Sequence, residues 1–307
     1  MDVYLPIAGL SVSAPLLAGL GAVVGFMSGL FGVGGGFLMT PALVWAGVPP
    51  TVAVASQASQ VTAASVSSVL TYRRRGGVDV RMGALMAVGG ALGVTAGVEL
   101  LAMLLRLGQA ELAIALSYLV LLSVVGALMM AESLQALLRG RRGQPAPRPR
   151  DRRPVWLYGL PFKMRFPRSR LYISALPPLG LGVFAGLLSA IMGVGGGFVL
   201  TPALVYLLRM PAGMVVGTSL VPIIFTTALA TVLQAGRNQT VDVVLAGLLM
   251  VGGVMGAQLG ARASLRFRAE ALRAVLALIV LACGLGMGLS LLLPPEDLFA
   301  FAEGPGG

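Results

Sequence analysis

The sequence contains no histidine and a single cysteine, Cys283, among its 307 residues. One cysteine cannot form a disulfide within the chain, and metal sites built from imidazole and thiolate ligands are not expected. The serine–histidine pair of many hydrolases is missing as well. The one lysine, Lys163, does not end a phosphate-binding loop of the form G-x-x-x-x-G-K-[ST]. We therefore expect no metal, no cofactor and no direct use of ATP by this chain.

Charged residues are scarce too, at 11% of the chain, whereas 57% of the residues are hydrophobic. The mean hydropathy is +0.92, and this composition indicates a polytopic membrane protein. Much of the net charge of +11 lies in residues 139–170. Basic segments beside membrane helices face the cytoplasm, so we expect this stretch to be cytoplasmic and expect no binding to nucleic acid.

Apolar runs follow one another along the chain. A helix that crosses a membrane needs ~20 residues, so the two short runs, 37–47 and 198–208, predict half-helices. The runs cover residues 14–31, 37–47, 50–72, 82–105, 110–134, 174–192, 198–208, 212–234, 243–265 and 271–293.

One glycine-rich segment occurs twice, as GVGGGFLMTPALVW at 32–45 and as GVGGGFVLTPALVY at 193–206. Each glycine disfavours helix continuation by about 1 kcal/mol relative to alanine, and Thr-Pro is typical of a helix start. Each copy therefore predicts a helix, a break, and a new helix that begins at Thr-Pro. A break inside lipid must be buried in protein or line a wet cavity. Two matching breaks in two halves point to the binding site of a transporter.

The two halves of the chain align, and their arginines suggest how each half is oriented. The loop after the third run is rich in arginine in the first half only, whereas the loop before the last run is rich in arginine in the second half only. These arginines are Arg73, Arg74, Arg75 and Arg81 in the first loop, and Arg262, Arg266, Arg268 and Arg273 in the second. Arginine-rich short loops face the cytoplasm. Equivalent loops are thus predicted on opposite sides of the membrane, which means inverted repeats.

The expected fold is an all-α polytopic membrane protein with two inverted-topology repeats. Each repeat holds a broken or re-entrant helix pair at GVGGG and three spanning helices, with five crossings per repeat as the alternative. The expected units are a first transmembrane repeat at 14–135, a basic Pro/Arg-rich linker at 136–173, a second repeat at 174–293 and a tail at 294–307. The linker is expected in the cytoplasm, and the tail and both termini outside. Asp79 and Asp242 are expected to cap the helices that follow them.

The doubled GVGGGF…TP segment, in a membrane protein of this length, resembles the sulfite exporter TauE/SafE family, also called the toluene-sulfonate uptake permease family. The resemblance covers about residues 14–135 and 174–293. It implies transport of sulfite, sulfonates or other small sulfur-containing or carboxylated anions across the bacterial inner membrane. It does not fix the compound or the direction of transport.

The candidate substrate site follows from the helix breaks. A helix N-terminus carries free N–H groups and a partial positive charge, so two converging ends hold an anion without lysine or arginine. The residues expected to contact the substrate are Gly34, Gly35, Gly36, Phe37, Thr40, Ser56, Gln57, Gly195, Gly196, Gly197, Phe198, Thr201, Thr218, Ser219 and Gln258. For Thr40 and Thr201 the alternative is capping of their own helices, and for the other polar residues it is hydrogen bonding between helices.

Glu99 is the acidic residue inside an apolar run. It is a candidate for proton coupling, or else a solvated residue at the headgroup level. Other glycines, namely Gly21, Gly25, Gly29, Gly182 and Gly186, are expected to let helices pack closely.

The sequence therefore predicts a secondary transporter that moves a small sulfur-containing anion by alternating access, with membrane lipid and the anion as its partners. An anion channel, or an uptake permease for another small carboxylate or inorganic anion, is the alternative. An intramembrane enzyme built on Ser28 or Ser189 is disfavoured, because it lacks a histidine base. The oligomeric state, monomer or homodimer, is left open.

Overall fold

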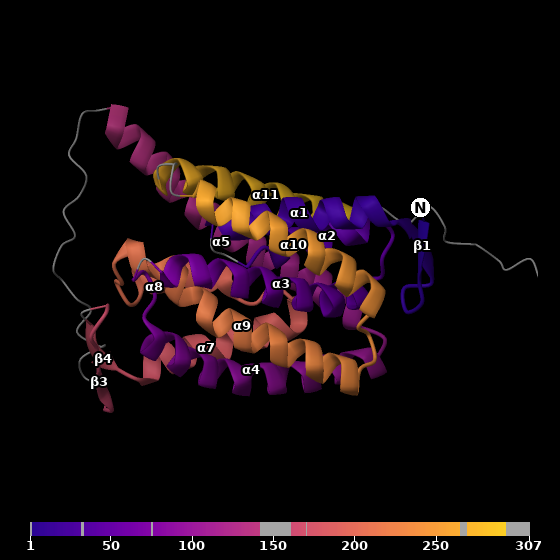
Figure 1. Cartoon of the computed structure of the whole chain (residues 1–307), viewed down its shortest axis with the longest axis horizontal. Coiled ribbons are helices and arrows are strands. Elements are labelled where there is room, and N and C mark those ends of the chain that lie inside the picture. Colours follow the sequence, from indigo (N-terminus) through magenta and orange to yellow (C-terminus); the bar gives the residue numbers. More distant parts are fainter. Residues whose placement is uncertain are drawn as a thin grey trace, which may run out of the picture.

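The computed structural model describes residues 2–31, 34–74, 76–141, 161–169, 171–264 and 269–292 of the chain, which form a helical bundle with two small hairpins (Figure 1). The helices are α1 (Ala14–Phe31), α2 (Gly36–Trp45), α3 (Pro50–Arg73), α4 (Val80–Arg106), α5 (Ala110–Arg141), α7 (Leu176–Met192), α8 (Gly197–Tyr206), α9 (Ala212–Arg237), α10 (Val243–Ala263) and α11 (Ala269–Leu292). The strands are β1 (Asp2–Leu5), β2 (Leu10–Ser13), β3 (Lys163–Phe166) and β4 (Leu171–Ser174).

Helices long and apolar enough to cross a membrane occur in both halves: Ala14–Phe31, Val80–Arg106, Ala110–Ala131, Gly213–Arg237 and Val243–Ala263. The fold is therefore that of a polytopic membrane protein. Helix α3 has 24 residues but is more polar, because it carries many hydroxyl and amide side chains. Several of these side chains are buried inside the protein. Ser56, Gln57 and Gln60 are all fully buried there. A helix with such a polar face survives in a membrane only in the middle of the bundle.

Glycines pair the first helix of each half with a helix of the other half. Helix α1 packs along α10, and α7 packs along α4. A methyl group on Gly21 would come within 2.7 Å of the Leu249 carbonyl oxygen. Gly25 lies directly against Gly253, and Gly186 against Gly90. These small residues bring the two backbones into contact, as the sequence predicts for packing glycines.

A short antiparallel hairpin precedes the first helix of each half. In the first hairpin Leu5 pairs with Leu10, and in the second Phe166 pairs with Leu171. The hairpins lie at opposite ends of the bundle, β1 beside the N-terminus and β3–β4 at the far end (Figure 1). The second hairpin lies almost wholly within the segment predicted as a basic Pro/Arg-rich linker, 136–173, and neither hairpin was predicted.

The predicted helix start at Thr-Pro is wrong. Helix α2 begins at Gly36 and α8 at Gly197, so Pro41 and Pro202 lie inside their helices. The reason is that the glycines themselves supply the turn, so the helix resumes directly after them. The prediction that Asp79 and Asp242 are N-caps is confirmed, since both side chains accept hydrogen bonds from N–H groups of the next turn. The predicted tail, 294–307, and most of the predicted linker lie outside the described residues.

Candidate functional site

Two glycine segments interrupt the helices, and both contain backbone conformations that favour glycine. In the second segment φ is +68° at Gly193, +73° at Gly195 and +68° at Gly196. In the first, φ is +87° at Gly34 and +67° at Gly35. Residues other than glycine rarely adopt backbone angles in this left-handed region. Each segment therefore turns the chain sharply between a long helix and a ten-residue one.

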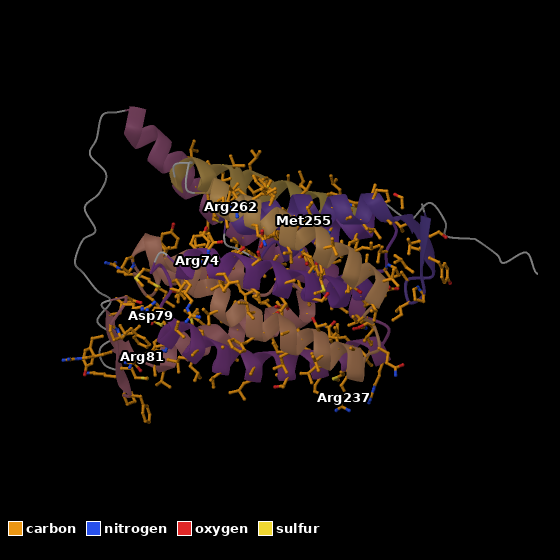
Figure 2. The ribbon with its side chains drawn as sticks, in the orientation of Figure 1. Arg74, Asp79, Arg81, Arg237, Met255 and Arg262 are labelled. Carbon is orange, nitrogen blue, oxygen red and sulfur yellow. The ribbon has the colours of Figure 1, made fainter. Side chains whose placement is uncertain are left out.

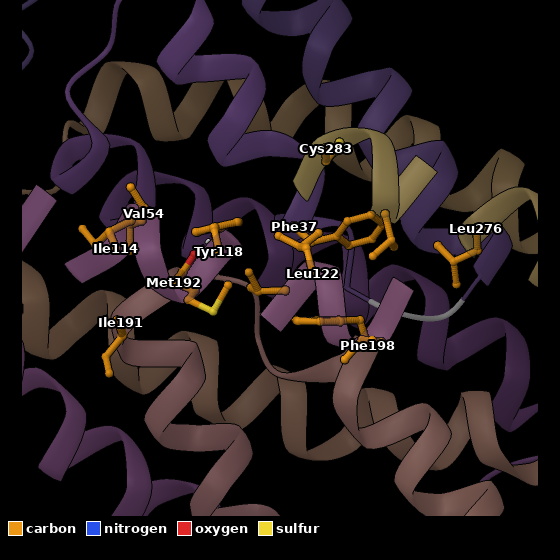
Figure 3. Packing of buried hydrophobic residues seen from close by; sticks show 14 of the residues in the cluster. Phe37, Val54, Ile114, Tyr118, Leu122, Ile191, Met192, Phe198, Leu276 and Cys283 are labelled. Carbon is orange, nitrogen blue, oxygen red and sulfur yellow. Dashed lines mark hydrogen bonds between the residues drawn. The ribbon is translucent and has the colours of Figure 1, made fainter. Parts of the chain in front are cut away.

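The two segments meet in the interior of the bundle. A methyl group on Gly36 would come within 2.8 Å of the Val194 Cα, and one on Gly34 within 3.1 Å of the Val194 carbonyl oxygen. The rings of Phe37 and Phe198 lie 6.1 Å apart, in the same buried cluster (Figure 3). The structure thus brings together the glycine and phenylalanine residues predicted to form the site, and packs them tightly.

The N-terminus of α8 has unused hydrogen-bond donors. Val199 and Leu200 donate to the Gly196 carbonyl, but the N–H groups of Gly197 and Phe198 donate to no backbone carbonyl of the described residues. Thr201, one turn further along, has a hydroxyl oxygen that is shielded from solvent and has no partner in the described part of the chain. Free amide hydrogens at the positive end of a helix attract an anion.

At the N-terminus of α2, a polar cluster joins the two halves. The Tyr118 hydroxyl, from α5, donates to the Met192 carbonyl oxygen at 2.6 Å and also lies 2.6 Å from the Thr40 hydroxyl. The Gln57 amide nitrogen, from α3, donates to the same carbonyl at 2.9 Å. Figure 3 shows Tyr118 pointing at Met192, at the end of α7. Tyr118, Gln57 and Thr40 are all fully buried.

Sequence reasoning missed Tyr118. The available signal was a tyrosine well inside the apolar run 110–134, because a phenolic hydroxyl buried among apolar side chains needs a partner. Its main partner, however, comes from the other half of the chain, and no local pattern reveals that contact.

Ser56 and Thr218, predicted to contact the substrate or to form hydrogen bonds between helices, each bind the start of a helix in the opposite half. The Asp242 backbone N–H donates to the Ser56 hydroxyl at 2.9 Å, and the Asp79 N–H donates to the Thr218 hydroxyl at 2.9 Å. The two contacts are equivalent in the two halves. Both hydroxyls are fully buried, so each satisfies an amide that has no access to water.

The same two aspartates hold the hairpins. The Asp242 carboxylate accepts a hydrogen bond from the Ile7 N–H at 3.0 Å, in the turn of the first hairpin. The Asp79 carboxylate accepts one from the Ser169 N–H at 3.1 Å, in the turn of the second, and a further one from the Ser169 hydroxyl. Each aspartate thus ties a helix start to a hairpin and to a hydroxyl of the other half. We call the two arrangements the Asp79 latch and the Asp242 latch.

The remaining predicted residues lie apart from the glycine segments or bind locally. Ser219 donates to the Val216 carbonyl of its own helix. Gln258 is exposed on α10. Glu99 pairs with Arg237 at 2.7 Å, and their side chains are 60% and 63% exposed. Figure 2 shows Arg237 at the edge of the bundle.

An apolar groove runs between α1 and α10 and is lined by Phe26, Met27 and Met255 among others. No residue of the glycine segments lines it. Because Met255 and Val23 are more than half exposed, the groove belongs to the lipid-facing surface. Among the described residues, no group of histidine, cysteine, aspartate or glutamate side chains is arranged to hold a metal ion.

Comparison with known proteins places the sequence in a family. The sequence model described as "Sulfite exporter TauE/SafE" matches residues 17–287. A probable membrane transporter protein of Xylella fastidiosa (strain 9a5c) is 33% identical over 268 residues, which cover 86% of this chain and 90% of that protein. The probable membrane transporter protein YjnA of Bacillus subtilis (strain 168) is 28% identical, over 87% of this chain and 96% of YjnA. No solved structure matches.

Proposed function

The chain belongs to the sulfite exporter TauE/SafE family, and from this premise we propose that it is a secondary transporter of a small sulfur-containing anion, of the sulfite or organosulfonate class. Family and relatives make it a membrane transporter. The proposal adds the substrate class, the binding site and the mechanism of alternating access.

The observation that carries the proposal is the meeting of two interrupted helices, each of which begins with an amide donor that has no backbone acceptor among the described residues: Phe37 at α2, and Gly197 and Phe198 at α8. These N–H groups lie where the two halves touch. Neither glycine segment contains a lysine or an arginine. A sulfonate or sulfite group has three acceptor oxygens, so it can satisfy several backbone donors at once.

Inverted repeats are supported by the positions of equivalent parts. The hairpins before α1 and α7 lie at opposite ends of the bundle (Figure 1). Arg74 follows α3 and Arg237 ends its counterpart α9, and they too lie at opposite ends, whereas Arg74, Arg81 and Arg262 share one end (Figure 2). We place this basic end in the cytoplasm of a bacterial cell, because arginine-rich loops stay inside.

Alternating access is supported by the tight closure of the site. The second glycine segment packs closely against α9, since a methyl group on Gly195 would lie 2.8 Å from the Ile223 side chain and 2.9 Å from the Thr227 side chain. An anion therefore reaches the amide donors only after one part of each repeat shifts relative to the rest. Coupling through Glu99 stays a prediction of the sequence, since the exposed pair with Arg237 adds no support for it.

Purified protein in liposomes tests the proposal. Sulfite, thiosulfate, 2-aminoethanesulfonate, sulfoacetate and a carboxylate analogue are offered as substrates. We expect saturable uptake of the sulfur anions and exchange between like substrates. Absence of binding and of flux for every anion of the panel contradicts the proposal, and flux far above carrier rates identifies an anion channel instead.

A further inference from the structure

Gln57 has one side of its amide group without a partner. The nitrogen donates to the Met192 carbonyl at 2.9 Å and lies 3.4 Å from the Tyr118 hydroxyl. The oxygen, Oε1, is buried and accepts nothing from the described residues. If the amide group were flipped, its oxygen would face the Met192 carbonyl oxygen, and both are acceptors. The amide nitrogen is therefore the atom that faces Met192. A buried acceptor without a hydrogen bond destabilises the folded protein, so such an atom usually has a donor as its partner.

The neighbouring donors are already in use. The Tyr118 hydroxyl has one proton, and it lies within 2.6 Å of both the Met192 carbonyl and Thr40. The Gln57 nitrogen also packs closely against Gly193, because a methyl group on Gly193 would come within 2.6 Å of that nitrogen. Gln57 therefore lies against the residue that ends α7 and opens the second glycine segment.

Among the described residues of the second half, no tyrosine-centred cluster of this kind occurs. Gln57 corresponds to Ser219, whose hydroxyl donates to its own helix. The last helix, α11, places Leu276, Ala277, Val280 and Cys283 in the buried core, and none of them carries a hydroxyl. Free amide donors lie at both helix starts, Phe37 at α2 and Gly197 and Phe198 at α8, and the first half adds a free buried acceptor, Gln57 Oε1.

Accordingly, we propose that Gln57 Oε1 accepts a hydrogen bond from the substrate, so that the site selects a small sulfonate carrying a hydroxyl or ammonium group beside its anionic head. Tyr118 is a positioning residue, because its hydroxyl lies 3.4 Å from the Gln57 nitrogen and so helps to fix the orientation of the amide group. The inference rests on the proposed function, since the sulfonate group is held by the amide donors of α8.

The test compares two sulfonates of equal charge and nearly equal size, 2-hydroxyethanesulfonate and propane-1-sulfonate. Titration of the purified full chain is expected to show roughly tenfold tighter binding of the hydroxylated compound, the value of one hydrogen bond in a dry site. In Gln57→Met this preference is expected to vanish, so that the two sulfonates bind equally. Tyr118→Phe, which keeps the ring, is expected to reduce the preference to a smaller extent.

Gln234→Met is the matched control. Gln234 is also fully buried, its amide nitrogen donates to the Ala190 carbonyl of α7 at 2.7 Å, and its oxygen has no partner in the described chain. Within the described part of the chain, Gln234 forms no hydrogen bond with the Tyr118 cluster. This variant is therefore expected to keep the wild-type preference.

The outcomes separate the inference from the proposed function. If the wild type binds anions of the panel but does not distinguish the two sulfonates, only the inference falls. It also falls if Gln57→Met and Tyr118→Phe are folded, by melting temperature without substrate, and keep the preference. If the wild type binds no anion, the proposed function fails and the inference with it.

Discussion

At the scale of single residues, buried polar side chains have different roles even where they are neighbours in the sequence. Ser56 and Gln57 are neighbours on α3 and both are fully buried. Ser56 accepts the Asp242 N–H, which ties two halves together, whereas Gln57 keeps a free acceptor. Burial alone therefore does not distinguish a side chain whose polar atom is already paired from one whose polar atom is free for a ligand, whereas the partner atoms do.

Removing the two latch hydroxyls tests their structural role. Thr218→Val and Ser56→Ala each leave a buried aspartate N–H without an acceptor, so we expect a loss of about 1–3 kcal/mol in the free energy of unfolding. Thr95→Val, at an exposed position where the hydroxyl donates within its own helix, is the control and is expected to change little. Thermal unfolding in detergent measures both. Weaker sulfonate binding with unchanged stability would show instead that these hydroxyls contact the substrate.

Glu99→Gln and Arg237→Gln remove the exposed ion pair. Such pairs contribute about 0–1 kcal/mol at a surface, so we expect small changes in stability and unchanged uptake under a pH gradient. The measurement is sulfonate flux into liposomes with and without that gradient, with the wild type in parallel. A response to the gradient that disappears in Glu99→Gln would confirm the sequence-based prediction that Glu99 is the proton-coupling residue.

At the scale of helices and strands, sequence periodicity and composition predict those features that depend on residues close together in the chain. The run 14–31 matches α1, and Asp79 and Asp242 cap helices as expected. The hairpins escaped prediction, because strands of four residues give too little alternation to read. What fixes them is a contact with an aspartate far along the chain. The role of Tyr118 and the partners of the latch hydroxyls could not be predicted for the same reason, since those partners lie in the other half.

Two glycines of α1 provide a matched test of close helix packing. A methyl group on Gly25 would run into the backbone of Gly253, whereas one on Gly19 meets nothing within 4 Å. We expect Gly25→Ala to destabilise the protein by about 1–3 kcal/mol through overpacking. Gly19→Ala is expected to be neutral or to stabilise by up to about 1 kcal/mol, because alanine is the better helix former. Melting temperatures of the two variants decide, and equal values would mean that α1 and α10 are not in contact along this face.

At the scale of the whole molecule, the two latches relate the halves to each other. Each half supplies an aspartate, a hydroxyl and a hairpin, and each aspartate binds the hydroxyl and hairpin of the other half. Neither half can form these contacts alone. The duplicated chain is therefore one cooperative unit, and the glycine segments meet where its halves join.

Opposite orientation of the halves is testable with two equivalent positions, Arg74 after α3 and Gly236 near the end of α9. Both are exposed, and Cys283 is the one native cysteine, so a Cys283→Ser background carries one new cysteine at a time. We expect Gly236→Cys to react with a membrane-impermeant maleimide in intact spheroplasts, and Arg74→Cys to react only after permeabilisation. The reason is that arginine-rich loops are retained inside, while inversion sends the equivalent loop to the other side. The unsubstituted Cys283→Ser protein controls for background labelling. Reaction of both positions from the same side would mean parallel repeats. The two helix ends would then no longer face each other across a pseudo-two-fold axis, and the alternating-access mechanism would lose its structural basis.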